Sequence, residues 1–246
     1  MKHFAVMGDP IAHSLSPKIH SLFSEQTHIP LDYQRLQVSA LGFSDALTHF
    51  KSYGHGLNIT APLKELAFRY CDQLTPRAKL AKSVNTIKID EKGSLIGDNT
   101  DGQGLVNDLN KRHHFSIKGK KIVIVGAGGA ARGIIPSLLE NGPSLLGIVN
   151  RTPEKAHRLA KEFNTLGAIT SHFSRVHVDL IVSTIPQINS ELLTPYQSCP
   201  FLYNINYSHV VEEDNALGML VEQAALSFEF WFGILPETKS IFGTLK

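Results

Sequence analysis

A glycine-rich turn between a β-branched run and a helical pattern constrains the fold of this chain more than any other feature. The run Lys121–Val125 has the composition of a strand that is buried on both faces of a parallel sheet. It leads directly into the segment Gly126–Gly133, and a helical pattern follows from Ile134 to Asn141. The turn has the form GxGxxA, and a preceding strand with a following helix is the context that dinucleotide-binding turns need. A glycine-rich turn that serves packing alone is the alternative, and these flanking elements disfavour it.

Each small residue of this turn has a physical role in holding a pyrophosphate. Gly126 permits the tight turn, Gly128 lets a pyrophosphate approach the backbone, and the small Ala131 lets the helix pack on the strand. The amides at the helix start, with the helix dipole behind them, attract the phosphate charge. We therefore predict that the cofactor is bound by Gly126, Ala127, Gly128, Gly129 and Ala130.

The end of the next predicted strand, 145–150, indicates which dinucleotide the turn would take. Sites specific for NAD usually carry Asp or Glu there, because the carboxylate binds the ribose 2′-hydroxyl. Here Asn150 is followed by Arg151 and Thr152, with Lys155 one helical turn later. Cations can pair with a 2′-phosphate, so we predict that these four residues bind NADP(H) in preference to NAD. A solvated helix start is the alternative interpretation of Arg151 and Lys155.

Strands and helices alternate on both sides of the turn, which predicts two α/β lobes. After the turn, predicted strands at 145–150 and 178–184 flank a predicted helix at 153–163, which is typical of a Rossmann-type doubly wound parallel sheet over about residues 120–210. The first hundred residues alternate in the same way, with predicted strands at 4–7, 31–38 and 56–60, helices at 19–26, 41–53 and 62–71, and a hairpin of 83–89 with 94–97. The polar stretch 111–119 is the best candidate for a boundary element. A length of 246 residues fits two such lobes.

Composition excludes several classes of partner. The chain has 24 Lys and Arg against 22 Asp and Glu, and this balance without a basic tract argues against nucleic acid or a membrane surface. Cys71 and Cys199 form no CxxC pair and the histidines are scattered, so we expect neither a disulfide framework nor a metal site. No apolar run is long enough to span a bilayer. We expect a reduced, cytoplasmic protein that binds small molecules.

Polar residues of the first lobe suggest acid–base chemistry, although each has a structural alternative. Ser14 and Ser16 precede Pro17 and could be turn or cap residues of a helix. Lys64 lies in the first turn of a helix opened by Pro62, where the helix dipole disfavours a cation and so favours proton transfer. It could also be a surface lysine. Asp101 could be only a helix cap, or it could hold a lysine across a cleft.

Taken together, the motifs of the chain resemble the shikimate dehydrogenase family. They occur in the family's order over nearly the whole chain, and several tight motifs in register are far more specific than a single glycine turn. The matching segments are Gly8–Pro17, Asn58–Glu65, Val84–Thr86, Gly97–Asp101, Gly126–Gly133, Asn150–Thr152 and Gly218–Ala224.

The resemblance implies reversible NADPH-dependent reduction of 3-dehydroshikimate to shikimate, in the route to chorismate and the aromatic amino acids. It implies Lys64 as general acid and base paired with Asp101, and Ile205 as a further cofactor-binding residue. The implied substrate-binding residues are Ser14, Ser16, Thr60, Asn85, Asp101, Tyr207 and Gln223. A dehydrogenase of quinate or a similar polyol and a ligand-binding relative without turnover are the alternatives.

The resemblance also implies how the domains are organised. A substrate-binding catalytic domain would comprise residues 1–100 with about 224–246, and an NADP-binding domain would comprise 101–223. The apolar helix Gly218–Phe232 would return the chain to the first lobe, with Gln223 facing the cleft. The segment Ser208–Ala216 is about a dozen residues shorter than in the family, so we expect a missing helix there. The oligomeric state is open, with a homodimer as one alternative.

Overall fold

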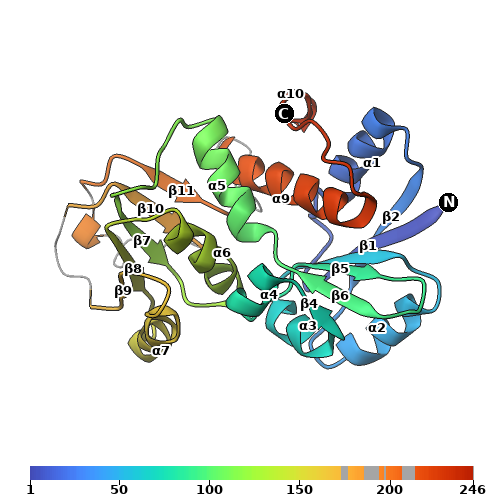
Figure 1. The fold of residues 1–246 in the computed structure, drawn as a ribbon, viewed down its shortest axis with the longest axis horizontal. Helices are drawn as coiled ribbons and strands as arrows, with labels where there is room; N and C mark the ends of the chain where they lie inside the picture. The colour runs from blue at the N-terminus through green and yellow to red at the C-terminus, as the bar shows by residue number, and fades with distance from the viewer. Residues whose placement is uncertain (173–176, 186–193, 197, 207–213, 246) are drawn as a thin grey trace.

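The computed structural model describes residues 1–172, 177–185, 194–196, 198–206 and 214–245. The chain forms two α/β lobes that lie side by side, with helices α5 (Asp101–Lys111) and α9 (Asp214–Phe232) between them (Figure 1). This confirms the predicted fold class, an N-terminal α/β lobe followed by a Rossmann-type lobe. Within the described ranges, none of the helices combines the length and the apolar character that a bilayer span requires.

The N-terminal lobe is built on a mixed six-stranded sheet in the order β2-β1-β3-β5-β6-β4. Its strands are β1 (Lys2–Gly8), β2 (Leu31–Gln37), β3 (Gly56–Ile59), β4 (Gln73–Leu74), β5 (Thr86–Ile89) and β6 (Leu95–Asp98). Its helices are α1 (Ser16–Thr27), α2 (Phe43–Lys51), α3 (Lys64–Tyr70) and α4 (Pro76–Ala81). The strands β1, β2 and β3 pair in parallel, with β1 and β3 largely buried and β2 partly exposed at the edge of the sheet, and β5 with β6 forms the expected antiparallel hairpin.

The C-terminal lobe is a parallel five-stranded sheet in the order β11-β10-β7-β8-β9. Its strands are β7 (Lys121–Val125), β8 (Leu145–Val149), β9 (Ile169–Thr170), β10 (Leu180–Ser183) and β11 (Leu202–Asn204). The helices are α5 (Asp101–Lys111), α6 (Gly129–Glu140) and α7 (Pro153–Phe163), with a 3-10 turn at Thr194–Tyr196. The strand order reverses between β7 and β10, and ligands bind at such a switch point, beyond the carboxyl ends of the strands.

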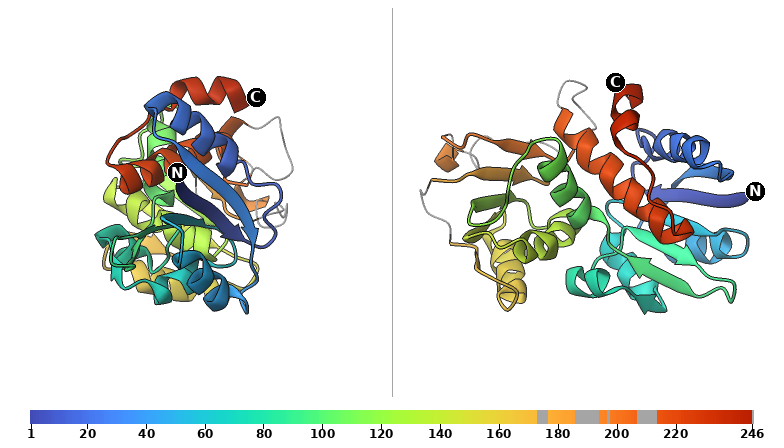
Figure 2. Two further views of the ribbon diagram at one scale, coloured as in Figure 1. Left: turned by 90° about the vertical axis from the view of Figure 1, so that its right-hand side faces the viewer. Right: turned by 45° about the horizontal axis from the view of Figure 1, so that its top comes forward.

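Helix α9 (Asp214–Phe232) crosses from the second lobe back to the first, and α10 (Lys239–Leu245) then packs near α1 (Figure 2). Met219 belongs to the core of the C-terminal lobe. About two turns later, Ala225 and Phe228 pack with Ile19 of α1 in a core of the N-terminal lobe. The last helices therefore return to the first lobe, as predicted.

Two elements of the N-terminal lobe are absent from the sequence prediction. Strand β4 has only two residues, too few for an alternation pattern to register. Helix α4 has six, but its start carried a readable signal, because the Thr75 side chain accepts a bond from the Ala78 amide and Pro76 follows directly.

Candidate functional site

A cavity of about 690 Å³ opens between the lobes, at the carboxyl ends of β7 and β10. Residues from both lobes line it, so the topological switch point of the second lobe faces the polar loops of the first. Eleven of the sequence-predicted site residues line this one space. They are Ser14, Ser16, Thr60, Lys64, Asn85, Asp101, Gly128, Gly129, Ala130, Ile205 and Gln223.

Lys64 and Asp101 form an ion pair in the cavity, with 2.6 Å between Nζ and Oδ2. Lys64 is the first residue of α3 and Asp101 is the first residue of α5, so each side chain projects from a helix start. The positive end of the α5 dipole favours the carboxylate, whereas that of α3 disfavours the ammonium. Both side chains are largely buried, at 13% and 5% exposed, which strengthens the pair relative to one in water.

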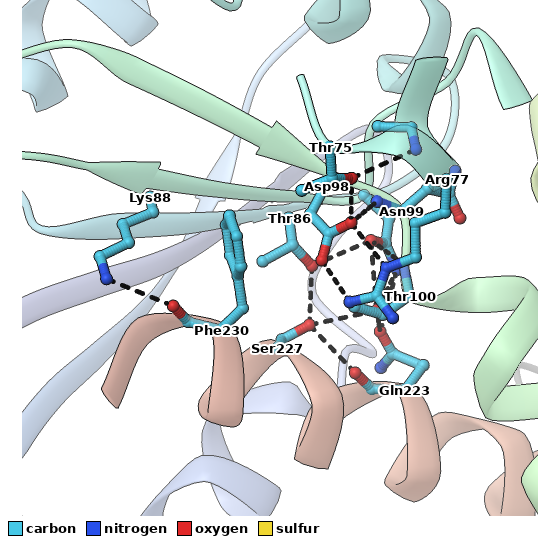
Figure 3. A network of polar contacts seen from close by, with 12 residues as sticks. Thr75, Arg77, Thr86, Lys88, Asp98, Asn99, Thr100, Gln223, Ser227 and Phe230 are labelled. Carbon is cyan, nitrogen blue, oxygen red and sulfur yellow. Dashed lines mark hydrogen bonds and ion pairs between the residues drawn. The ribbon is translucent and has the colours of Figure 1, made fainter. Parts of the chain in front are cut away.

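The segment before Asp101 is anchored by Asp98, which is fully buried. The Asp98 carboxylate accepts bonds from Thr75 Oγ1 at 2.5 Å and from the Arg77 guanidinium, and it also accepts the Asn99 amide (Figure 3). These contacts fix the loop that leads into α5. Thr100, and not Asp101, occupies the N-cap position of that helix.

Asn85 connects the acid to the last lining helix. Its Nδ2 lies 2.8 Å from Asp101 Oδ1 and 3.2 Å from Gln223 Oε1. Its Oδ1 accepts the Thr100 amide at 2.9 Å, which fixes the orientation of the carboxamide. Asp101 is therefore held through both oxygens, one by a lysine and one by an amide.

Hydroxyl groups gather on the side of the cavity that β1 and α1 form. Ser14 and Ser16 are nearly fully buried, and Ser14 Oγ accepts the Ser16 amide at 3.3 Å. Arg35 Nε donates to the Ser14 carbonyl at 2.8 Å, which holds this loop against β2. Thr60, at the end of β3, completes the group. The three hydroxyls can donate to a carboxylate.

The glycine turn has the shape that its sequence predicts. Gly126 adopts φ +116°, and a Cβ atom at this position would lie 2.2 Å from Thr184 Oγ1, so only glycine fits. A Cβ atom at Gly128 would meet nothing within 4 Å, which leaves the amides at the start of α6 open to a phosphate. Ala131 is fully buried in the core beneath them. The turn therefore fits a pyrophosphate.

The predicted 2′-phosphate residues lie at the end of β8 and the start of α7, outside the cavity lining. Asn150 Nδ2 donates to the Thr152 carbonyl at 3.0 Å, which shapes the turn. Arg151 and Lys155 are exposed, and across the described parts of the chain neither is ion-paired to an acid. Their donor groups are therefore available to an anion.

An ion cluster joins the two lobes beside the cavity. Arg132 of α6 binds the Glu162 carboxylate of α7 through two 2.8 Å contacts, and Lys82 of the N-terminal lobe approaches the same carboxylate at 2.7 Å. These two cations lower the pKa of Glu162 to about 2, with the hydrogen bonds from Arg132 as the largest cause. Glu65, which lines the cavity, lies 3.9 Å from Arg132.

One predicted site residue lies outside the described residues, and the cavity lining contains a polar residue that the sequence analysis did not assign. Tyr207 and most of the shortened segment 208–216 lie outside the described residues. Asn58, absent from the predicted site, lines the cavity from within β3. A carboxamide inside a four-residue strand that is buried throughout was the signal that could have found it, because buried amides need partners.

Metal chemistry has no support among the residues that can be described. No group of three or more His, Cys, Asp or Glu side chains gathers there in a way that could hold an ion.

Three family comparisons cover most of the chain. Residues 6–87 match the shikimate dehydrogenase substrate binding domain, residues 108–187 match shikimate / quinate 5-dehydrogenase, and residues 217–241 match the shikimate 5′-dehydrogenase C-terminal domain. The matched ranges contain most of the cavity lining and the glycine turn.

Individual relatives are similar over their full length. The chain is 42% identical to shikimate dehydrogenase (NADP(+)) of Nitrosococcus oceani, with 99% of this chain and 94% of that protein covered. It is 41% identical to the enzyme of the same name from Psychromonas ingrahamii, with 100% and 98% covered. Both alignments run over more positions than the 246 residues of this chain, so these relatives carry residues that it lacks.

A solved structure shares the arrangement of both lobes. Shikimate 5-dehydrogenase from Thermus thermophilus, in complex with NADP(H) and shikimate, superposes with a TM-score of 0.86 at 28% identity. The superposition covers 100% of this chain and 98% of that one. That protein holds both ligands in a fold like this one.

Proposed function

The chain belongs to the shikimate dehydrogenase family, and from this premise we propose that it reversibly reduces 3-dehydroshikimate to shikimate with NADPH. It is an NADP-dependent oxidoreductase. The observation that carries the proposal is the Lys64–Asp101 pair, because it lies in the same cavity as the amides of the glycine turn. A proton donor and a phosphate-binding turn that share one space are what this reaction requires.

We propose that Lys64 is the general acid and base. In the direction of reduction, its ammonium donates a proton to the ketone oxygen as that oxygen becomes a hydroxyl, and in oxidation the amine takes the proton back. Asp101 holds the ammonium in place through its 2.6 Å contact. The 2.8 Å bond from Asn85 to the other carboxylate oxygen supports an orienting role for the acid.

The same cavity offers groups for the rest of the substrate. Ser14, Ser16 and Thr60 would bind the carboxylate, since hydroxyl donors suit that group. Asn85 and Gln223 would hold the ring hydroxyls, because a carboxamide can both donate to and accept from an alcohol. Both sets lie within one lining, which supports a single substrate that carries both kinds of group.

NADPH supplies the hydride when it is bound. The backbone of Gly126, Ala127, Gly128, Gly129 and Ala130 would hold its pyrophosphate, and Asn150, Arg151, Thr152 and Lys155 would hold its 2′-phosphate. Ile205 contributes an apolar surface to the cavity on that side. The open space over Gly128 supports this arrangement.

Steady-state oxidation of shikimate and of quinate, each with NADP and with NAD, tests the proposal. We expect turnover of shikimate with NADP, with a lower kcat/KM for quinate and for NAD. A preference for quinate would move the assignment to a polyol dehydrogenase, because pocket contacts and not the fold decide substrate choice. Measured ligand binding without turnover would instead identify a binding protein. Light scattering on the same sample decides between a monomer and a homodimer.

A further inference from the structure

Ser227 lies on α9 one turn after Gln223, and it is fully buried. Its hydroxyl lies within hydrogen-bonding distance of four groups, and those of Thr86, Thr100 and Gln223 can be followed in Figure 3. Thr86 Oγ1 is 2.7 Å away, Thr100 Oγ1 is 3.2 Å away, and Asn58 Nδ2 donates to it at 3.1 Å. Ser227 itself lies 3.0 Å from the Gln223 carbonyl, to which it can donate. One hydroxyl thus joins two strands, the loop before α5 and helix α9.

The Ser227 hydroxyl contacts two residues of the cavity lining, Asn58 and Gln223, directly, and it reaches a third, Asn85, through Thr100. Thr100 Oγ1 lies 2.8 Å from Asn85 Nδ2, the same amide that binds Asp101 and Gln223. The connection from Ser227 to the carboxylate of the acid therefore passes through only two side chains.

Asn58 shows why the hydroxyl matters for orientation. Tyr33 Oη donates to Asn58 Oδ1 at 2.6 Å, so the oxygen end of the carboxamide is fixed by Tyr33. The nitrogen end is shared among the Asn85 carbonyl, Thr86 Oγ1 and Ser227 Oγ, and Ser227 gives the shortest of these contacts. Without the serine, the amide protons of the buried Asn58 lose one of their three acceptors.

A hydroxyl supplies one proton and accepts through two lone pairs, so three of its four contacts can be hydrogen bonds at one time and none of its capacity is left unused. The surrounding positions on α9, Ala224 and Phe228, are buried and offer no polar side chain to replace it. Removal of the oxygen would leave the hydroxyls of Thr86 and Thr100 free to turn toward other acceptors, and the carboxamides that face the cavity would lose a common orientation.

We propose that Ser227 is a positioning residue for the reaction, because it orients the carboxamides of Asn58, Asn85 and Gln223 toward the ring hydroxyls of shikimate. The inference rests on the proposed function. Ser227 does not reach the cavity itself and acts through its neighbours. We expect Ser227 to affect the binding of shikimate and not the binding of the cofactor, because its partners all lie on the side of the cavity that is proposed to hold shikimate.

The test is the Ser227→Ala variant, with Ser183→Ala as the matched control. Ser183 is a buried serine of β10 whose hydroxyl has no hydrogen-bond partner among the described residues. We expect the KM for shikimate to rise about tenfold in Ser227→Ala, as loss of one satisfied buried bond implies. The KM for NADP should stay within a factor of two, and Ser183→Ala should change neither value.

A second variant keeps the inference testable if Ser227→Ala folds poorly. Thr86→Val replaces the nearest hydroxyl partner by a side chain of the same shape, and it should also raise the shikimate KM alone. If both residues act through one network, the double variant should show less than the sum of the two effects. Thermal unfolding of each variant is followed alongside.

The outcomes separate this inference from the proposed function. A wild-type protein that does not oxidise shikimate overturns the function. A wild-type protein that does so, with a shikimate KM in Ser227→Ala within a factor of two of its own, overturns only the role of Ser227. A rise in both KM values together would indicate a general loss of structure and would overturn it as well.

Discussion

The Lys82 ammonium of the N-terminal lobe lies 2.7 Å from Oε1 of Glu162 in the C-terminal lobe. Arg132 holds the same carboxylate from the side of its own lobe through two 2.8 Å contacts. Lys82 is more than half exposed, so its contact across the lobes adds little by itself. The bidentate pair with Arg132 should contribute more, because it is better shielded from water and geometrically fixed.

We expect Glu162→Gln to lower the free energy of unfolding by about 1 kcal/mol at pH 7. The folded-state pKa of Glu162 is about 2, below its ordinary value of 4.5. The stabilisation is therefore fully present above pH 4.5 and is lost as the pH falls toward 2. Urea titrations at several pH values measure the free energy of unfolding of the variant and of the wild type. The difference between these two free energies should become smaller below pH 4.5. Glu25→Gln, which changes an exposed acid outside the first turn of α1, should show no such difference.

Lys64→Ala should lower kcat for shikimate oxidation by about 10²- to 10⁴-fold, because the general acid and base is removed. The KM for NADP should stay unchanged, since Lys64 lies on the substrate side. Steady-state kinetics with both substrates varied gives the two constants. Lys79→Ala on the surface of α4 is the matched control. A kcat near the wild-type value would show that another group transfers the proton.

Arg151→Ala should raise the KM for NADP about 10- to 100-fold and leave the KM for NAD nearly unchanged. The reason is the loss of a charge-assisted contact that only the 2′-phosphate can make. Arg158→Ala, which removes an exposed arginine from α7, the helix that follows Arg151, controls for the change in net charge. Equal effects on the two cofactors would contradict the assignment of Arg151.

Gly104 allows α5 and α9 to approach closely. A Cβ atom there would lie 2.7 Å from Cβ and 2.8 Å from the backbone nitrogen of Gln223, so the two helices would have to separate. We expect Gly104→Ala to cost about 1–3 kcal/mol in stability and to raise the KM for shikimate through displacement of Gln223. Gly243→Ala in α10, where a Cβ atom meets nothing within 4 Å, should be neutral or slightly stabilising. Thermal unfolding and steady-state kinetics of both variants measure these effects.

The sequence was sufficient for the parts of the fold that depend on local pattern. The strand Lys121–Val125 and the turn at Gly126 are confirmed, because the strand is a buried β-branched run and Gly126 adopts a positive φ at a point where a Cβ atom would clash with Thr184. The return of α9 to the first lobe is also confirmed, and the family resemblance had implied it. The boundary between domains at about residue 100 stays a prediction.

Long-range contacts could not be read from local pattern. Lys64 and Asp101 meet only because two helix starts converge, and the resemblance rather than spacing indicated their pairing. The ion cluster at Glu162 joins residues from both lobes, and charged surface residues give no pairwise signal in one sequence. Ser227 is a single hydroxyl within an apolar helix, and only the folded position of Thr86 and Thr100 explains it.

Helix α9 belongs to the interior of both lobes, since Met219 packs in one and Phe228 in the other. Neither half of the chain can therefore be excised as an independent module. A fragment of the chain without α9 would expose apolar core residues in both lobes. A single lobe that keeps α9 would leave the apolar residues of the other half of this helix exposed to water. We therefore expect that exchange of the nucleotide-binding lobe between related enzymes succeeds only if the residues of both lobes that pack against α9 are matched to that helix.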